Sequence, residues 1–298
     1  MNLVVTSLAN TSWGMYQKQQ RAFEDRYQAK QIGPFKYLAV FDGHGGTAQR
    51  AFFSSNNVTT EKQRSDYFYQ GQIASHIADF ATNSLHNVLA REFSTIDIND
   101  AQEVSSAISR SFITFDQNAR LAGALYGCTC TMLLIDNTHH RIYQVNLGDS
   151  RSMIFDEHGI LLSSTVDHVP ENIEEQQRIE LAGGEVINDR VQGVLAVSRA
   201  FGDYSLKTNN DILYDPINGC VSSVPSITVI DTTGTDRLYY LLTSDAPYEM
   251  GRFTDNDLIV MMCRLLRSTD SYEGIAKKLV NNIVQWTTDD ITIVVGLC

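Results

Sequence analysis

Acidic side chains recur at the ends of the apolar stretches of this chain. Strand ends meet at one edge of a sheet, so carboxylates placed there come close together and repel one another unless a cation neutralises them. Oxygen ligands of this kind suit Mg²⁺ or Mn²⁺ better than zinc. Asp also favours the turns that end strands, so each position alone is consistent with a simple turn. Four such positions together predict a divalent metal site, and they are Glu24-Asp25, Asp42, Asp245 and Asp289-Asp290.

A glycine-rich segment follows the second of these positions and reads Asp42-Gly43-His44-Gly45-Gly46. Glycines let the backbone approach a ligand closely and leave a carbonyl unshielded by a side chain. His44 titrates in the range that suits a proton donor to a leaving oxygen. The alternative interpretation is a surface turn with a structural histidine. The segment is no nucleotide-binding P-loop, because it lacks the Gly-Lys-Ser/Thr ending.

Apolar patterns predict the elements that must position these side chains. Stretches rich in apolar and β-branched residues predict strands at Tyr37–Phe41, Thr129–Ile135, Arg141–Leu147, Ser152–Phe155, Leu238–Thr243 and Ile291–Leu297. Helical spacing predicts helices at Ile73–Val88, Val104–Phe115, Pro170–Leu181, Leu258–Leu265 with Thr254 or Asp255 as N-cap, and Ile275–Ile283. Helices in separated pairs favour two sheets flanked by helices over an alternating parallel fold. We expect one domain over residues 1–298, with an irregular insertion at 205–224.

Composition narrows the classes of function. The chain has 298 residues, a net charge of -12 and a pI near 4.9, which argues against electrostatic binding of nucleic acid or anionic membranes. It contains no apolar run of the roughly 20 residues that a membrane helix needs, and its first residues lack the pattern of a signal peptide. The 5 cysteines show no Cys-x-x-Cys spacing and suggest neither a disulfide framework nor a zinc site. We therefore expect a cytoplasmic protein, with a nuclear location as the alternative.

Short motifs occur in a fixed order along almost the whole chain. They are Glu24-Asp25, Val40–Gly46, Gly127–Thr129, Asn146–Arg151, Asp167–Pro170, Ala182–Gly184, Leu195–Asp203, Thr243–Asp245 and Asp289–Thr292. In this series the chain resembles the protein phosphatase 2C class of metal-dependent serine/threonine phosphatases. The resemblance implies an α+β fold, a four-layer α-β-β-α sandwich of two antiparallel sheets flanked by helices. It also implies two divalent cations, Mn²⁺ or Mg²⁺, at one edge of the sandwich.

The same resemblance assigns metal ligands. Asp42 would bridge the two ions, and the carbonyl of Gly43 would ligate one of them. Asp245 and Asp289 would complete the protein ligands of the other ion, while Asp25 would hold metal-bound water. A water between the two ions would attack the phosphorus directly, without a phosphoenzyme.

Further roles follow from the resemblance. Glu24 would hold a metal-bound water, and Thr129 would hydrogen-bond within that water network. His44 would protonate the leaving seryl or threonyl oxygen. Asp149 and Glu249 match positions that bind a weaker third metal ion in relatives.

The chain departs from the family pattern at several positions. Gln20 stands where relatives carry the Arg that binds the substrate phosphate. Either the neighbouring Arg21 takes that role or phosphate binding is weakened. On an extended strand, an offset of one residue would point the Arg21 side chain to the opposite face. The segment Ala246–Glu249 replaces the usual Gly-x-x-Asp. Arg151 and Arg199 lie in the family motifs, and we expect them to form structural ion pairs.

These observations predict a phosphoprotein phosphatase that acts on phosphoserine and phosphothreonine, with phosphoprotein partners, no nucleic acid or membrane partner, and a monomeric state. The alternative is a pseudophosphatase that keeps the fold as a scaffold or binding module. A metal-dependent hydrolase of small phosphoesters is a third interpretation. The insertion at 205–224 resembles the variable flap beside the active site of this family and is either a substrate-selecting element or a plain surface loop.

Overall fold

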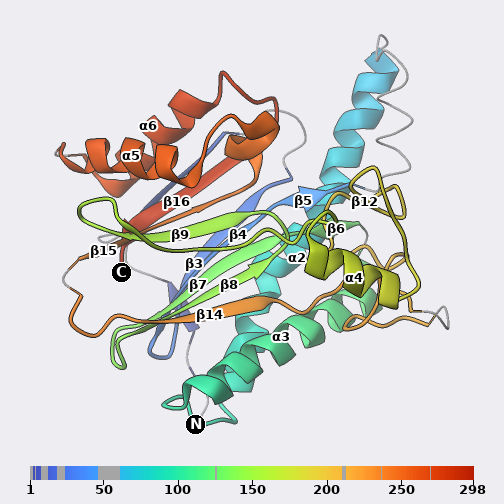
Figure 1. Ribbon diagram of the computed structural model, residues 1–298, viewed down its shortest axis with the longest axis horizontal. Helices are drawn as coiled ribbons and strands as arrows, with labels where there is room; N and C mark the ends of the chain where they lie inside the picture. Colours follow the sequence, from blue (N-terminus) through green and yellow to red (C-terminus); the bar gives the residue numbers. More distant parts are fainter. Residues whose placement is uncertain are drawn as a thin grey trace.

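The computed structural model describes residues 3, 5–7, 13–18, 24–45, 61–124, 126–209, 213–235, 237–268 and 270–298. Two large antiparallel sheets form the centre of the molecule (Figure 1). The first sheet has the strand order β1 (Val5–Ser7), β3 (Arg26–Ile32), β4 (Phe35–Phe41), β7 (Cys130–Asp136), β8 (Arg141–Leu147) and β14 (Ser226–Asp231). The second has the order β10 (Leu161–Ser164), β9 (Arg151–Asp156), β15 (Leu238–Thr243), β16 (Ile291–Leu297) and β2 (Trp13–Lys18).

A pair of helices covers the outer face of each sheet, as Figure 1 shows. The helices α2 (Glu61–Phe93) and α3 (Ala101–Leu121) share a buried apolar cluster with the first sheet. The helices α5 (Asp255–Leu266) and α6 (Tyr272–Ile283) share another with the second sheet. A third cluster lies between the sheets. The predicted four-layer α-β-β-α sandwich is therefore confirmed.

Strand β4 shows why the central strands are rich in apolar residues on both faces. Leu38 and Val40 lie in the cluster between the sheets, whereas Tyr37, Ala39 and Phe41 lie in the cluster under α2 and α3. Alternate side chains of a strand point to opposite faces, and both faces are covered here. From Tyr37 to Phe41 the strand therefore carries no charged side chain, and the acidic Asp42 comes directly after it ends.

Shorter elements lie at one end of the sandwich. A small sheet has the order β13 (Phe201–Gly202), β6 (Gly127–Cys128) and β5 (Gly43–His44). The helix α4 (Ile173–Leu181) precedes a hairpin of β11 (Val186–Ile187) and β12 (Arg190–Val191), and the 3-10 segment η1 (Ala246–Gly251) follows β15. Figure 1 shows α4 and β12 at the same end of the sheets.

Helix starts follow local capping chemistry. Thr254 is the N-cap of α5 and forms a capping box with Asp257, so Thr254 rather than Asp255 is the cap. The prediction that Pro170 opens α4 was wrong. This helix begins at Ile173, because the side chain of Asn172 accepts a hydrogen bond from the Glu174 N–H.

The predicted insertion at 205–224 contains turns and isolated bridges, and its described residues form no helix and no strand of the main sheets. It is nevertheless anchored. Lys207 is fully buried and its Nζ lies 2.7 Å from Oδ2 of Asp116 on α3. The role of this segment as a flap and the single-domain organisation stay predictions. In the described part of the chain, no helix has the length and apolar character needed to cross a membrane.

Candidate active site

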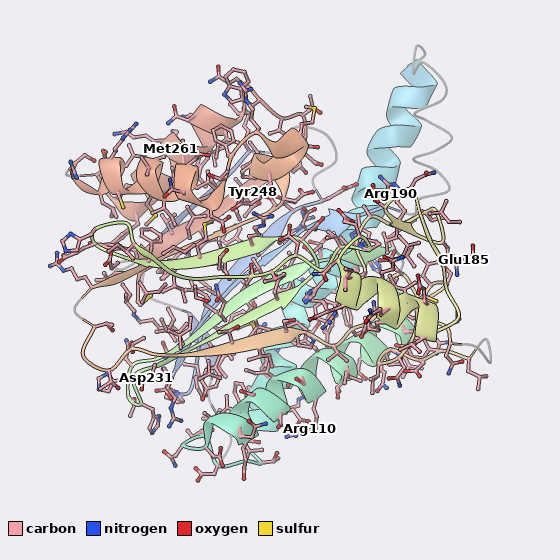
Figure 2. All side chains as sticks on the ribbon, in the orientation of Figure 1. Arg110, Glu185, Arg190, Asp231, Tyr248 and Met261 are labelled. Carbon is pink, nitrogen blue, oxygen red and sulfur yellow. The ribbon has the colours of Figure 1, made fainter. Side chains whose placement is uncertain are left out.

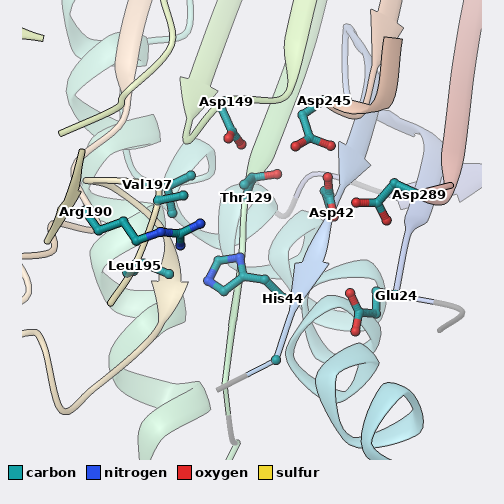
Figure 3. A pocket seen from close by; sticks show the side chains of 12 residues that line it. Glu24, Asp42, His44, Thr129, Asp149, Arg190, Leu195, Val197, Asp245 and Asp289 are labelled. Carbon is teal, nitrogen blue, oxygen red and sulfur yellow. The ribbon is translucent and has the colours of Figure 1, made fainter. Parts of the chain in front are cut away.

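A pocket opens where strands of both large sheets end (Figure 3). Its lining combines acidic residues, one histidine, one arginine and a short apolar stretch, and consists of Glu24, Asp42, His44, Gly45, Thr129, Asp149, Arg190, Leu195, Ala196, Val197, Asp245 and Asp289. The pocket thus brings together residues from distant parts of the sequence.

The acidic residues of the pocket come from the ends of buried strands. Asp42 directly follows β4 and Asp149 lies in the turn from β8, so these two belong to the first sheet. Asp245 lies just after β15 and Asp289 just before β16, in the second sheet. Figure 3 shows these four carboxylates around the same space, with Glu24 at its side. The expected convergence of acidic strand ends is therefore present.

Burial and charge repulsion both oppose ionisation of the carboxylates in this pocket. Burial raises the pKa of Asp42 well above its ordinary value, and the carboxylates of Asp25 and Asp245 raise it further. Burial and the neighbouring Asp245 likewise raise the pKa of Asp149. Burial and the neighbouring carboxylates therefore disfavour the ionised forms of Asp42 and Asp149.

Asp25 lies behind the pocket lining and is 1% exposed. Burial raises its pKa to about 8 against the lowering influence of the nearby Thr292 and Ser244 side chains, and the carboxylate of Asp290 raises it further. Its Oδ2 is buried without a hydrogen bond in the described part of the chain. A buried carboxylate oxygen without a donor suits interaction with a cation or a cation-bound water.

The donor set fits hard divalent cations. All the acidic groups of the pocket offer carboxylate oxygens, the ligands that Mg²⁺ and Mn²⁺ prefer. Among the described His, Cys, Asp and Glu side chains, no group of three or more has the spacing to hold a metal ion directly. The carboxylates surround the pocket from both sheets without closing on a single point.

His44 and Thr129 lie at the pocket with fixed neighbours. The Nε2 of His44 is 2.6 Å from Oδ2 of Asp203, which directly follows β13. The hydroxyls of Thr129 and Ser150 are 2.7 Å apart. Sequence reasoning missed Asp203 as a partner of His44, although both residues lie in family motifs.

Arg190 is a pocket residue that sequence reasoning missed. It opens β12, and among the described residues that line the pocket it is the single Arg or Lys. Its guanidinium points toward His44 in Figure 3, and its NH1 donates to the Val194 carbonyl. No pattern in the sequence distinguished it from other exposed arginines. Gln20 and Arg21 lie outside the described residues.

Some expected site residues do not line the pocket. Gly43 lies next to Asp42 and pairs with Cys128 in the small sheet. Glu249 is absent from the lining, and its carboxylate accepts a hydrogen bond from the Thr287 hydroxyl. Thr287 in turn accepts a hydrogen bond from the Asp289 N–H at 3.0 Å.

Arg151 and Arg199 form the expected structural ion pairs. Arg151 makes two hydrogen bonds of 2.7 Å to Asp167 and one of 3.2 Å to Asp255. Arg199 donates to Glu175 at 3.0 Å. All three acids are distant from their arginines in the sequence, so the pairs connect separate segments around the site.

Comparisons with known proteins agree with this geometry. A family model described as Protein phosphatase 2C matches residues 67–291. Protein phosphatase 2C homolog 3 of Schizosaccharomyces pombe is 29% identical over 256 residues, which cover 86% of this chain and 53% of that protein. The Integrin-linked kinase-associated serine/threonine phosphatase 2C of Bos taurus is 30% identical over 294 residues, covering 87% of this chain and 75% of that protein. The chain spans about half the length of several curated relatives that it matches.

Solved structures show the same fold. A phosphatase from a pathogenic strain of Toxoplasma gondii superimposes with a TM-score of 0.73 at 18% identity, covering 98% of this chain and 94% of that one. The arrangement of the sheets, the order of the motifs and the extent of the family match agree, and the chain belongs to the protein phosphatase 2C family.

Proposed function

We propose that this chain is a metal-dependent protein phosphatase that hydrolyses phosphoserine and phosphothreonine in phosphoproteins. The observation that carries this proposal is the gathering of acidic strand ends from both sheets at one pocket, where burial and mutual repulsion raise the pKa of Asp42 and Asp149. Such a cluster is costly for a fold unless a cation compensates it. Membership of the protein phosphatase 2C family supports the same chemistry.

Asp42, Asp245 and Asp289 would hold two divalent cations, Mn²⁺ or Mg²⁺, with the Gly43 carbonyl and Asp25 as further oxygen donors. When bound, the cations would neutralise the phosphate dianion and lower the pKa of a water, so that hydroxide is available near neutral pH. Glu24 lines the pocket beside these groups and would accept hydrogen bonds from water there. Asp149 also lines it and is the group through which a weaker third ion would bind.

The remaining pocket residues would handle the substrate. Arg190 would bind the phosphate or a phosphate-flanking group, because its guanidinium points into the pocket and can make paired hydrogen bonds to phosphate oxygens. His44 would give a proton to the leaving oxygen, and Thr129 would orient water. Water would attack the phosphorus directly and displace the alcohol. The segment 205–224 would act as a flap beside this site, in a monomeric, single-domain protein.

A pseudophosphatase scaffold is the second candidate. The position of Glu249 favours it, because this residue replaces the family Asp and is hydrogen-bonded to Thr287 outside the pocket lining. A scaffold would bind phosphoproteins, with or without Mn²⁺, and would not hydrolyse their phosphate esters.

The test is hydrolysis of a phosphothreonine peptide with Mn²⁺, with Mg²⁺ and with neither, for the wild type, Asp42→Asn and Asp245→Asn. We expect turnover that needs metal and that falls in both variants by on the order of 100-fold or more, because each variant removes an anionic ligand from the cation site. Mn²⁺ binding measured by calorimetry should weaken in parallel.

Asp231→Asn is the matched control. Asp231 is exposed at the end of β14, and Figure 2 shows it at the opposite end of the molecule from Arg190. This variant should keep wild-type turnover. A folded wild type that binds Mn²⁺ but hydrolyses no phosphopeptide would favour the scaffold, and turnover of p-nitrophenyl phosphate alone would favour a hydrolase of small phosphoesters.

A further inference from the structure

His44 and Asp203 meet across the small three-stranded sheet. The central strand β6 places Gly127 opposite His44 of β5 on one side and opposite Gly202 of β13 on the other. Asp203 directly follows Gly202, and its Oδ2 lies 2.6 Å from Nε2 of His44. The side chain of His44 is 15% exposed and that of Asp203 is 10% exposed. The contact is therefore short and largely shielded from solvent.

Gly127 provides the space that this pair occupies. A Cβ at this position would lie 2.0 Å from Oδ2 of Asp203 and 2.3 Å from Nε2 of His44. Real atoms do not approach so closely, so any other residue would displace both partners. The absence of a side chain at Gly127 is a requirement of the pair.

The backbone holds Asp203 in an uncommon conformation. Its φ is 49°, in the left-handed region that non-glycine residues seldom adopt. Its N–H donates to the Tyr126 carbonyl at 2.9 Å, and its carbonyl accepts from the Leu206 N–H at 2.8 Å. A residue keeps such a conformation only when its surroundings determine it. The carboxylate of Asp203 is thus aimed by the backbone.

A buried ion pair anchors this backbone to α3. Oδ1 of Asp116 accepts a hydrogen bond from the Gly202 N–H at 2.7 Å, and Oδ2 of Asp116 is 2.7 Å from Nζ of Lys207. Oδ2 also accepts from the Tyr214 hydroxyl at 2.9 Å. Two residues of the segment 205–224 therefore bind the carboxylate of Asp116, and the same carboxylate holds the backbone N–H of Gly202, the residue before Asp203.

We propose that Asp203 is a positioning residue for His44. An ionised carboxylate only accepts hydrogen bonds, so Nε2 of His44 donates to Asp203. In the protonated imidazolium form the second ring nitrogen, Nδ1, also carries a proton, which it can give to the substrate, and His44 is left neutral with its Nε2–H on Asp203. In this step the bond from phosphorus to the water oxygen forms and the bond to the seryl or threonyl oxygen breaks. The leaving oxygen keeps the electron pair of the broken bond and takes the proton from His44, so it departs as the alcohol.

This inference rests on the proposed phosphatase function and makes a specific prediction about leaving groups. An alkoxide is a poor leaving group and needs the proton, whereas p-nitrophenolate is stable near neutral pH and does not. Loss of a positioned acid should therefore slow the hydrolysis of a phosphothreonine peptide far more than the hydrolysis of p-nitrophenyl phosphate. A residue that only supports the fold would slow both substrates alike.

The experiment measures kcat and KM for both substrates with saturating Mn²⁺. Asp203→Asn keeps the shape of the side chain, and Asn tolerates the left-handed backbone. We expect its kcat to fall on the order of 10-fold or more for the phosphopeptide and by less than about 3-fold for p-nitrophenyl phosphate, with KM little changed. Gly127→Ala should show the same selectivity, because the added methyl separates the pair.

Controls make the result decisive. Gly274→Ala, where a Cβ would meet its nearest neighbours at an ordinary 3.5 Å, should match the wild type on both substrates. In a His44→Ala background, Asp203→Asn should change neither rate further, because its effect acts through His44. Equal losses on both substrates, or a full further loss without His44, would overturn the positioning role while leaving the phosphatase function standing. A wild type that hydrolyses neither substrate with Mn²⁺ would overturn both.

Discussion

At the scale of single residues, Asp25 shows how the two sheets share one charged site. It lies just before β3 of the first sheet, and its backbone carbonyl accepts a hydrogen bond of 2.7 Å from the Gln17 side chain on β2 of the second sheet. Its carboxylate lies near the side chains of Ser244 and Thr292, at the ends of strands in the second sheet. The Ser244 N–H donates to the Thr292 carbonyl and the Thr292 N–H donates to the Ser244 hydroxyl, so these two residues stay together. The site is thus held by polar contacts that cross between the sheets, in addition to the apolar core that joins them.

The turn before β16 is a second residue-scale device, and it yields a testable prediction. The Thr287 hydroxyl donates to Glu249 and accepts from the Asp289 N–H at 3.0 Å, so it fixes the backbone of a proposed metal ligand. Thr287→Val removes both bonds. We expect it to lower the free energy of unfolding by about 1–3 kcal/mol and to weaken Mn²⁺ binding several-fold. Urea denaturation and calorimetry measure the two effects.

Thr288→Val is the control, because Thr288 is the exposed neighbour of Thr287. It should leave both quantities near their wild-type values. If Thr287→Val also leaves Mn²⁺ binding unchanged, the turn does not contribute to metal affinity, and Glu249 has no part in positioning Asp289.

Sequence reasoning located some site residues and missed others for a physical reason. Asp42, Asp245 and Asp289 were identifiable because each adjoins a buried apolar strand, and strand ends converge. Arg190 lies on a two-residue strand of an exposed hairpin, with no periodic pattern around it. Asp203 depends on a left-handed backbone conformation and on Gly127, neither of which a linear pattern encodes.

At the scale of elements, burial explains which strands could be predicted. β7 is buried along its whole length, and its residues 132–135 form a continuous apolar run. β3 is only partly buried except at its last residue, and its sequence is mixed polar and apolar. β14 is an edge strand of the first sheet and carries several exposed side chains. Strands without a buried face therefore lacked the apolar signal, although they belong to the same sheets.

The connection of α3 to the segment 205–224 is the element-scale feature with the clearest energetic consequence. Lys207→Met leaves the carboxylate of Asp116 buried without its cation. We expect the free energy of unfolding to fall by about 3–5 kcal/mol, the usual cost of breaking a buried pair. Urea denaturation measures this loss. Phosphopeptide turnover should also fall, because Asp116 fixes the Gly202 N–H next to Asp203.

Lys278→Met provides the matched control, since Lys278 pairs with Asp270 on the surface. Exposed pairs contribute about 0–1 kcal/mol, so this variant should unfold close to the wild type. The double variant Asp116→Asn/Lys207→Met should recover part of the stability that Lys207→Met loses. Equal effects of the two lysine variants would contradict the anchoring role of Lys207.

At the scale of the whole molecule, His168 and Glu175 tie the pocket end of the sandwich together. Nδ1 of His168 accepts from the Gly148 N–H at 3.1 Å, so its Nε2–H donates to Ser226 on β14. Glu175 on α4 accepts hydrogen bonds from Arg178 of the same helix and from Arg199, which lies in the segment that leads to Asp203. Both groups are almost fully buried, at 4% and 3% exposed. Their titration therefore affects how several segments stay assembled.

Both groups make the fold sensitive to acid. Burial lowers the pKa of His168 from 6.5 to about 3, so as pH falls below 6.5 the unfolded chain binds a proton that the folded protein refuses. Burial opposes ionisation of Glu175, but the charges and hydrogen bonds of Arg199 and Arg178 outweigh it and lower the pKa from 4.5 to about 2. The stabilisation from Glu175 is thus present above pH 4.5 and is lost as pH falls toward 2. The loss from His168 extends from pH 6.5 to about 3, and the loss from Glu175 extends from pH 4.5 to about 2. The free energy of unfolding should therefore decline most steeply where both occur, from pH 4.5 to about 3.

His168→Gln tests the upper part of this window. Wild-type stability should fall from about pH 6.5 downward with a slope approaching about 1.4 kcal/mol per pH unit for each group that has begun to titrate. The variant should be less stable near neutral pH, because it loses the hydrogen bonds to Gly148 and Ser226. Between about pH 6 and about pH 5, however, its free energy of unfolding should change less steeply with pH, because the unfolded variant takes up nearly one proton fewer than the unfolded wild type. Urea denaturation across this range measures the slopes. His158→Gln, at an exposed histidine, should keep the wild-type slope, whereas an unchanged slope in His168→Gln would mean that His168 takes up its proton equally in the folded and unfolded states.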